Sequence, residues 1–475
     1  MPAKLQQVTI AYKKNHGKNH GFFILSLGIW SHQYLFENIL AAFLPVLIVY
    51  NGAYFKLLQS PLGTDVHYQG YAMLRLTSVC VFLFSALALA VNSGYSLGAV
   101  LLLLSSTALL WQRPRLDLQR RDYLILGTLL FYFLIFTVNM LYHGDPTREL
   151  DMPLRALLAI PVMLLLLAYP PHPAAWWGGV ACGAIAGAGV AIWQMIALGE
   201  MRPYAATSNA IHYGNASMLL GLLSVSGLGW AQEQRHATGW SLLLVLGCLA
   251  GIFGSIASGS RGGWIAIPVF TCIFVAHHAR QRGKRYLQVA LAVVVVLVGI
   301  AFAAPQSLVR ERTLTALTEV RKFENTGNVD TSIGQRIEMW RTALSMSDEH
   351  VFLGIGRNGY LAQKEDLVAA GRMSTTVRDY TNAHNDYLDA LVKRGSIGLL
   401  ALLAFLLVPL YMFAGALRQG TLAMQHFSLA GVALCTCYLI FGLTTTSLTL
   451  NIGIIMLVFP MVILWALLRH QERTS

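Results

Sequence analysis

The chain has 475 residues, of which 56% are hydrophobic and 12% are charged. This balance excludes a soluble enzyme, because apolar runs of about 16–22 residues recur along the chain and each can cross a hydrocarbon core of roughly 30 Å as a helix. The net charge of +12 would suggest a nucleic-acid partner in a soluble domain, but the basic residues cluster in short connectors, as the positive-inside rule requires. We therefore expect an all-α, polytopic bundle in a phospholipid bilayer, with no nucleic-acid partner.

The N-terminal part of the chain is the least regular. Residues 1–21 are basic and polar, and no small-residue cleavage site closely follows them, so we predict a cytoplasmic tail and not a signal peptide. Residues 22–55 are apolar but interrupted by polar side chains, which fits either one span with an interfacial piece or a short hairpin. Residues 56–70 form a polar connector. Twelve clearer candidate spans follow, at 72–91, 95–111, 123–142, 154–168, 176–198, 209–230, 238–257, 262–276, 286–303, 396–414, 427–446 and 449–468.

The connectors predict how these spans are oriented. Arginine and lysine concentrate in three connectors, which the positive-inside rule assigns to the cytoplasm: 112–122, 277–285 and 469–473. The number of spans between these connectors is consistent with that assignment. Four other segments then face the opposite side of the membrane: 143–153, 199–208, 258–261 and 304–383. With both termini in the cytoplasm the number of spans is even, so we expect twelve or fourteen.

The long segment 304–383 is too polar to enter lipid. It contains a helical pattern with an apolar face at Ile337, Trp340 and Leu344, and its glycines mark a turn at 354–360. A loop of this length in a tightly connected membrane protein is usually functional. We therefore divide the chain into an N-terminal transmembrane bundle, a periplasmic loop domain and C-terminal transmembrane helices with a cytoplasmic tail: 1–303, 304–395 and 396–475.

The six cysteines all fall within apolar runs. None shows CxxC spacing or a metal-site pattern with histidine, so we expect buried packing residues and neither disulfides nor a metal site. The six are Cys80, Cys182, Cys248, Cys272, Cys435 and Cys437.

Arg261 lies between two predicted spans, in the glycine-containing turn 258–264. Glycine lets a backbone approach a ligand closely, and a charge at the membrane boundary is a functional-site hypothesis by default. Between residues 237 and 276, Arg261 is the only charged residue. We favour phosphate binding over the alternative, an arginine that snorkels at a turn.

Two further arginines are weaker candidates. Arg336 precedes the predicted helix in the long loop, and its planar guanidinium could grip phosphate oxygens with two bonds. The alternative is a surface arginine paired with Glu338 or Asp330. Arg202, in the short loop 199–204, has no distinctive motif around it.

His384 opens the last polar stretch before the membrane. We expect Asn382 or Thr381 to cap the following helix and His384 to lie in its first turn, with Gly395 and Gly398 closing that helix. Histidine exchanges protons near neutral pH, and the positive helix end would favour the neutral imidazole, so His384 is a candidate general base.

The structural alternative is that His384 only packs. Asp386 and Asp389, which follow it, would then be solvated positions on the helix surface. No cluster of histidine and carboxylate side chains indicates a metal site, and no P-loop or nucleophile elbow is present in the sequence.

With these pieces in place, the chain resembles the O-antigen ligase family of bacterial membrane glycosyltransferases. The resemblance rests on His384 and Asn385 with glycines downstream, on the element 260–262, on the run 335–360, and on one large loop late in a polytopic chain. It covers roughly residues 200–450. O-antigen polymerases and protein O-oligosaccharyltransferases of the same superfamily share much of this pattern.

The resemblance implies a transfer reaction on the periplasmic face of the bacterial inner membrane. The donor would be O-antigen on undecaprenyl diphosphate, and the acceptor a sugar hydroxyl of lipid A–core oligosaccharide. The reaction would invert the anomeric centre and need no divalent metal or other cofactor. The implied roles are a base, diphosphate-binding arginines and supporting residues: His384; Arg261 and Arg336 with the less distinctive Arg202; and Asn385, Tyr387 and Tyr360.

Three alternatives stay open at this point. An O-antigen polymerase or a protein O-oligosaccharyltransferase would use the same donor and keep the same arginines and histidine. A transporter or flippase for lipid-linked sugars belongs to a different class. Transporters commonly show internal repeats or paired broken helices, and the sequence shows neither.

Overall fold

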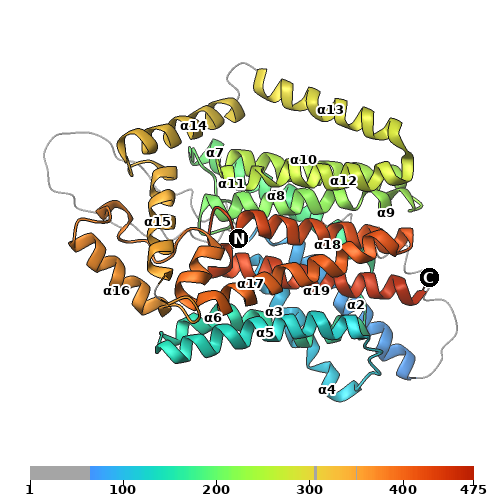
Figure 1. Ribbon diagram of the computed structural model, residues 1–475. Helices are drawn as coiled ribbons and strands as arrows, with labels where there is room; N and C mark the ends of the chain where they lie inside the picture. Colours follow the sequence, from blue (N-terminus) through green and yellow to red (C-terminus); the bar gives the residue numbers. More distant parts are fainter. Residues whose placement is uncertain (1–64, 304–307, 349, 475) are drawn as a thin grey trace, which may run out of the picture. The chain divides into compact units, whose positions relative to one another are not determined.

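The computed structural model describes residues 65–303, 308–348 and 350–474. The predicted cytoplasmic tail and the interrupted apolar stretch 22–55 lie outside the described residues. Within those ranges the chain forms helices and no strand, which confirms the predicted all-α class (Figure 1). By length and composition, nine of the described helices could cross a membrane, and Gly70–Ala86 is a shorter apolar helix. The total of twelve or fourteen spans stays a prediction.

The described chain begins with a series of apolar helices and short connecting helices. Up to the long polar segment these are α2 (Asp65–Ala86), α3 (Gly94–Ser106), α4 (Ala108–Gln112), α5 (Arg120–His143), η2 (Thr147–Leu150), α6 (Asp151–Ala168), α7 (Pro173–Ala197), α8 (Ala210–Ser226), α9 (Leu228–Gln232), α10 (Ala237–Ala257), α11 (Arg261–Trp264), α12 (Ala266–Arg282) and α13 (Lys284–Ala303). The polar segment and the C-terminal helices follow as α14 (Leu308–Thr326), α15 (Ser332–Ser347), α16 (Gly356–Ala369), η3 (Thr375–Val377), α17 (Asp386–Gln419), α18 (Leu422–Phe441), η4 (Ser447–Thr449) and α19 (Asn451–Thr474).

Some helix ends differ from the sequence prediction. The predicted span 209–230 is divided into α8 and α9 at Gly227. The predicted span 262–276 runs on to Arg282, because the polar residues after 276 are mostly good helix formers and the helix ends only at Gly283, whose φ is 84°.

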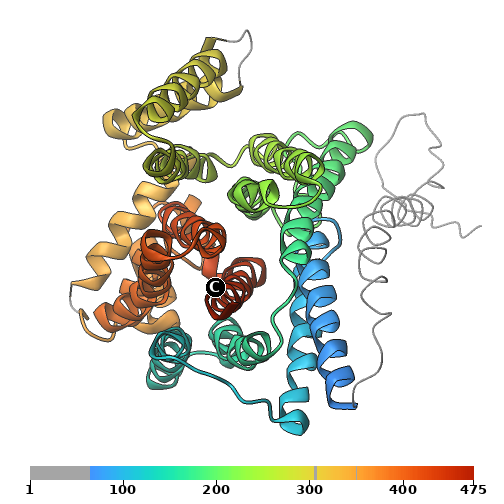
Figure 2. The ribbon, with the colours of Figure 1, turned by 90° about the vertical axis from the view of Figure 1, so that its right-hand side faces the viewer.

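The C-terminal helix α19 is the centre of the bundle. Nearly all its side chains are buried, and it packs against α3, α6, α8 and α18. Figure 2 looks along the helices from the side of the C-terminus and shows α19 inside the other helices. A continuously apolar helix of this kind belongs in a protein interior, because it has no polar face to present to water.

A buried ion pair anchors the C-terminal end of α19. The Arg469 Nε donates to Asp122 Oδ1 at 3.0 Å, and both side chains are fully buried. The Trp465 indole nitrogen donates to the same oxygen at 2.7 Å. Asp122 lies in the first turn of α5, so these bonds connect that turn to the last turns of α19.

The connectors gather at the two ends of the bundle. At one end, which we call the basic end, Arg473 donates to the Asp117 carbonyl at 2.8 Å and Gln281 to the Gln425 side chain at 2.7 Å. The predicted cytoplasmic connectors therefore lie at one end of the bundle, to the right in Figure 1. The compartment that this end faces stays a prediction.

The opposite end, which we call the loop end, carries α14, α15 and α16 (Figure 1). Asp145, in the connector after α5, accepts the backbone N–H groups of Arg357 and Asn358 at 2.8 and 2.9 Å. The connector 199–208 also belongs to this end, because Arg202 Nε donates to the Ser258 carbonyl at 3.2 Å. The segments predicted to share the non-cytoplasmic side thus meet in the structure.

The polar segment has its own small core. Met339, Ala343 and Met346 of α15 are buried there, against residues of α16 and the first part of α17. Of the predicted apolar face, Ile337 and Trp340 are half-buried, whereas the prediction is wrong for Leu344, which is 48% exposed. Both sets have helical spacing, so the neighbouring elements decided which face is covered.

Two glycines let the polar segment approach α17 closely. Gly354 has φ 69° and Gly395 has φ 65°, both in the left-handed region that suits glycine. A Cβ on Gly395 would lie 2.2 Å from the Phe352 carbonyl carbon. Ser396 N donates to the Val351 carbonyl at 2.7 Å. Gly395 therefore kinks α17 where it meets the polar segment, whereas Gly398, predicted to help close the helix, continues it.

Four of the six cysteines are buried, as expected. The prediction is wrong for Cys272, which is exposed on α12, and for Cys248, which is half-buried on α10. An apolar membrane helix can place a cysteine on its outer surface, where the apolar surroundings are lipid and not protein.

Candidate functional site

His384 lies in a tight turn immediately before α17. Its φ is +49°, and its N–H donates to the Asn382 side chain at 3.1 Å. The prediction that His384 lies inside the first helical turn is wrong, because Asn385 is the N-cap and its side chain accepts from Tyr387 N and Leu388 N at 3.0 Å each. Histidine is one of the few non-glycine residues enriched in this conformation, which costs on the order of 1–3 kcal/mol.

The imidazole of His384 is half-buried and held in its neutral form. Its Nδ1 is buried and has no hydrogen-bond partner among the described residues, and its ring meets the Tyr380 ring edge to face, with centroids 5.0 Å apart. Burial, and after it the nearby Arg336 guanidinium, together lower the pKa of His384 to about 4 against the opposing charge of Asp389. The lowered pKa favours the neutral imidazole, mainly through burial and not through a helix end.

A buried lysine holds the turn-containing segment before His384 in place. The Lys364 ammonium donates to the carbonyls of Val377 and Arg378 at 2.9 and 3.0 Å, and also to the carbonyl of Tyr380. Burial, with the positive charge of Lys393, lowers the pKa of Lys364 to about 8. Three bonds from one ammonium group fix the backbone that positions the Tyr380 and His384 rings.

Arg336 lies within α15, which begins earlier than predicted. Thr331 caps this helix by accepting from Gly334 N at 3.0 Å, so Arg336 does not precede the helix. Burial lowers the pKa of Arg336, as do the positive charges of Arg261 and Arg202, while Glu319 and Tyr380 oppose the change. The three predicted arginines therefore act on one another electrostatically, and Arg336 acts on His384.

Glu319 of α14 neutralises part of this arginine cluster. Its carboxylate accepts from Arg261 Nη2 at 3.2 Å and from the Ile333 backbone N–H at 3.3 Å. Both side chains of the ion pair are largely shielded from solvent, Arg261 with 24% and Glu319 with 15% exposure. Glu319 thus places a carboxylate where an anionic ligand of Arg261 would bind.

Three acidic residues named in the structural alternatives have other partners than those alternatives require. Glu338, one suggested partner of Arg336, instead accepts from the Ser374 backbone N–H at 2.6 Å. Asp386 and Asp389 are not solvated, because each is buried. Asp386 accepts from Ser447 N at 3.0 Å, and Asp389 pairs with Lys393 at 2.7 Å.

Of the predicted supporting residues, Asn385 and Tyr387 hold the His384 turn in place, and Tyr360 is buried in the core of the polar segment. Asn385 Nδ2 donates to the Leu443 carbonyl at 3.1 Å, and the Tyr387 hydroxyl donates to the Leu439 carbonyl at 2.7 Å. These bonds attach the turn to the end of α18. The Tyr360 ring is fully buried beneath two ammonium groups, with Lys364 at 5.7 Å and Lys393 at 5.1 Å.

Several residues at the site were not singled out from the sequence. Tyr380 links the two halves of the site, since its ring contacts His384 and its hydroxyl donates to Gln335 beside Arg336 at 3.1 Å. Residues 380–384 are not helical, so the spacing of four residues gave no signal. Glu319 and Lys364 lie among other charged residues and give no signal either. Across the part of the chain that the structure describes, no three histidine, cysteine, aspartate or glutamate side chains form a group that could hold a metal ion.

Residues 246–403 match the family model described as O-antigen ligase (Wzy_C). The matched segment covers less than half of the chain. It begins in α10 and ends in α17, and it contains Arg261, Arg336 and His384 but not Arg202. The chain is also similar to an uncharacterized protein of Haemophilus influenzae, with 27% identity over 380 residues that cover 79% of this chain and 94% of that protein. The matched segment therefore spans the polar segment together with the membrane helices on both sides of it.

Proposed function

We propose that the chain transfers O-antigen polysaccharide from undecaprenyl diphosphate to a sugar hydroxyl of lipid A–core oligosaccharide. The reaction takes place at the periplasmic face of the bacterial inner membrane, inverts the anomeric centre and uses no divalent metal. The observation that carries this proposal is that the Tyr380 ring contacts His384 while its hydroxyl donates to Gln335 beside Arg336, within a segment that matches the O-antigen ligase family model. The loop end would face the periplasm and the basic end the cytoplasm, because basic connectors remain on the cytoplasmic side.

The arginine cluster would bind the diphosphate of the donor. Arg261 and Arg336 present guanidinium groups that can hold phosphate oxygens in pairs, with Arg202 adding to the positive field. As the bond between the anomeric carbon and the phosphate oxygen breaks, the diphosphate leaves with the electron pair. Fixed guanidinium groups stabilise that developing charge without reorganising.

His384 would act as the general base. A sugar hydroxyl is a weak nucleophile, and an imidazole nitrogen that removes its proton as the new glycosidic bond forms contributes about 10²–10⁴-fold. A base with a pKa near 4 is weak, but a bound diphosphate would offset the positive charges that depress the pKa of His384. Donor binding would therefore activate the base.

The experiment that tests this proposal supplies the purified protein with lipid-linked O-antigen and three acceptors in separate reactions. The acceptors are lipid A–core oligosaccharide, a second lipid-linked glycan and a pilin-like protein. Product on the lipid A–core alone supports the ligase. Product on the second glycan alone would identify a polymerase, and product on the protein alone a protein O-oligosaccharyltransferase. Lipid movement without any glycosyl transfer would identify a transporter.

A further inference from the structure

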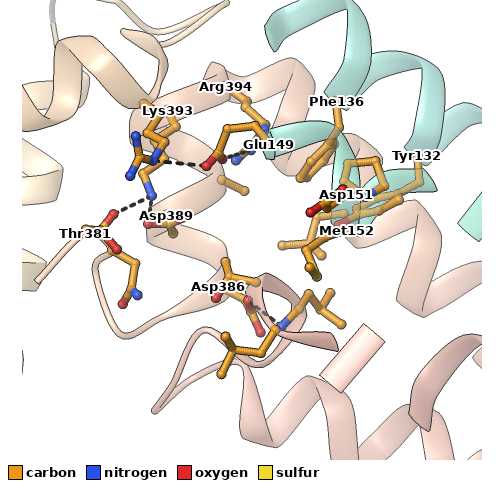
Figure 3. Close-up of a pocket in the computed structure, with 18 of the residues that line it drawn as sticks. Tyr132, Phe136, Glu149, Asp151, Met152, Thr381, Asp386, Asp389, Lys393 and Arg394 are labelled. Atoms are coloured by element: carbon orange, nitrogen blue, oxygen red, sulfur yellow. Dashed lines mark hydrogen bonds and ion pairs between the residues drawn. The ribbon is translucent and has the colours of Figure 1, made fainter. Parts of the chain in front are cut away.

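A cavity lies at the loop end, apart from the arginine cluster. It has a volume of about 310 Å³ and lies where α5, η2, α6 and α17 meet η4 (Figure 3). Arg261, Arg336 and His384 do not line it. Its volume is at the lower end of the range for ligand pockets, about 300–1,000 Å³. The cavity can therefore hold one small ring or head group but no long glycan.

One wall of the cavity consists of paired charges. Glu149 accepts from Arg357 Nε at 3.0 Å and lies 3.5 Å from Arg394 Nη2, and all three side chains are between 12% and 22% exposed. Lys393 pairs with Asp389 at 2.7 Å. Since these groups hold one another, their donors and acceptors are already oriented before any ligand binds.

The opposite wall is mainly apolar. Met152 and the Tyr132 ring face the charged pairs across the cavity in Figure 3, and Phe136 lies beneath the Arg394 guanidinium at 4.3 Å. Asp151 adds a carboxylate on this side. Arg357, Lys393 and Arg394 are already held by carboxylates, so these cations are less available to a phosphate ester. Fixed donors and acceptors beside an apolar wall instead match the hydroxyl groups and C–H faces of a sugar ring.

The cavity adjoins the His384 turn. Thr381 and Asn382 line it, and the Asn382 side chain accepts the backbone N–H of His384 at 3.1 Å. One turn of chain therefore separates a ligand in this cavity from the proposed base. The cavity also lies beside the part of α17 that precedes the Gly395 kink, where the polar segment meets the apolar helices.

We propose that this cavity binds a sugar ring of the membrane-anchored acceptor, other than the ring whose hydroxyl reacts at His384. This inference rests on the proposed function, which requires an acceptor saccharide near His384 while the donor diphosphate occupies the arginine cluster. The cavity holds the saccharide near the membrane surface, and the reactive hydroxyl reaches around the 381–384 turn. It therefore contributes to acceptor affinity and not to donor affinity.

The test fills the cavity in the full-length protein, reconstituted in nanodiscs. Met152→Trp replaces a lining side chain by a larger one without changing any charge. We expect the variant to bind lipid A–core oligosaccharide at least 10-fold more weakly, with unchanged affinity for undecaprenyl diphosphate. Leu134→Trp is the matched control, because Leu134 lies on α5 and is 45% exposed; it should bind both ligands as the unmodified protein does.

Glu149→Gln serves as a second variant if Met152→Trp does not fold. It keeps the shape of the side chain but removes the charge that orients two arginines, and we expect at least 3-fold weaker acceptor binding. Unchanged acceptor affinity in a folded Met152→Trp or Glu149→Gln variant overturns the inference.

Two further ligands identify which part of the acceptor is bound. Lipid A without its core oligosaccharide, and phosphatidylglycerol vesicles, should neither bind in the cavity nor compete for it. Equal competition by either would assign the cavity to a lipid head group and overturn the inference. Because binding is measured without turnover, a protein that binds lipid A–core through the cavity but transfers no O-antigen would refute only the proposed function.

Discussion

The chemistry at the residue scale depends on how the surroundings of His384 change its affinity for a proton. Burial is the larger cause of its lowered pKa, and the positive charge of Arg336 is the second. Both act on the free protein, in which Nδ1 has no partner among the described residues. An unpaired buried nitrogen costs free energy that a substrate hydroxyl could recover by donating to it.

His384→Ala should reduce transfer by about 10²–10⁴-fold while donor affinity stays unchanged, because the imidazole removes a proton and does not hold phosphate. Arg336→Ala should weaken donor binding as well. Single-turnover rates and binding of a labelled donor separate the two effects. His350→Ala, at an exposed position in the same polar segment, is the control. Normal turnover in folded His384→Ala would remove this residue from the site.

The pH dependence of the free enzyme should report the same imidazole. Because the neutral form is the base, kcat/KM should stay high above the lowered pKa and fall only as the pH drops towards about 4. Arg336→Gln removes one cause of the lowering, so its weaker residual activity should already fall at a higher pH, closer to 6.5. A pH profile of kcat/KM for both proteins measures this shift. Identical acid limbs would show that Arg336 does not act on the titrating group.

At the scale of secondary-structure elements, α14 matters because it brings Glu319 to Arg261. This ion pair occupies a guanidinium that the donor diphosphate would need, so the donor must displace the carboxylate or move α14. Glu319→Gln should therefore lower the KM for the donor severalfold at low ionic strength, since an amide competes less well than a carboxylate. Glu324→Gln, on the same helix, is the control. A higher donor KM in Glu319→Gln would mean instead that Glu319 positions Arg261 for binding.

The kink in α17 sets the angle between the polar segment and the membrane helices. Gly395→Ala should destabilise the protein by at least about 1–3 kcal/mol, because alanine is strained at this φ and its Cβ would meet the Phe352 backbone. Gly415→Ala on the same helix meets nothing within 4 Å and should be neutral or slightly stabilising. Thermal unfolding in detergent compares the two variants. Equal stability would show that the 352–354 segment readily moves away.

At the scale of the whole molecule, a fully buried ion pair and the proposed catalytic residues lie at opposite ends of the bundle. The Asp122–Arg469 pair is at the basic end, whereas the arginine cluster and His384 are at the loop end. Asp122→Ala breaks the buried pair with Arg469, whose other carboxylate partner is Glu472, and leaves the buried Trp465 indole N–H without its acceptor, so it should cost about 3–5 kcal/mol of stability. Arg121→Ala, at a side chain 39% exposed, should cost far less. Donor and acceptor KM values of the folded Asp122→Ala protein should stay unchanged, and a changed donor KM would contradict this separation.

Much of the fold could be predicted from the sequence because membrane insertion leaves few choices. An apolar run in lipid must form a helix to satisfy its backbone, and basic connectors must gather on one side. The same logic singled out Arg261, since an isolated charge between two spans is conspicuous. His384 was noticed because it stands where a polar segment returns to the membrane. The Wzy_C match includes Arg261, Arg336 and His384.

The sequence by itself thus determined the helical class, the position of the polar segment and the residue types available at the site. Only the tertiary structure decided that Asn385 is the cap, that Met339 and Ala343 face inward, and that Glu319 reaches Arg261. Backbone hydrogen bonding and hydropathy are local along the chain, so they can be read from neighbouring residues. Burial, charge pairing and the pKa of an imidazole depend on residues distant in sequence, and these become neighbours only when the helices pack.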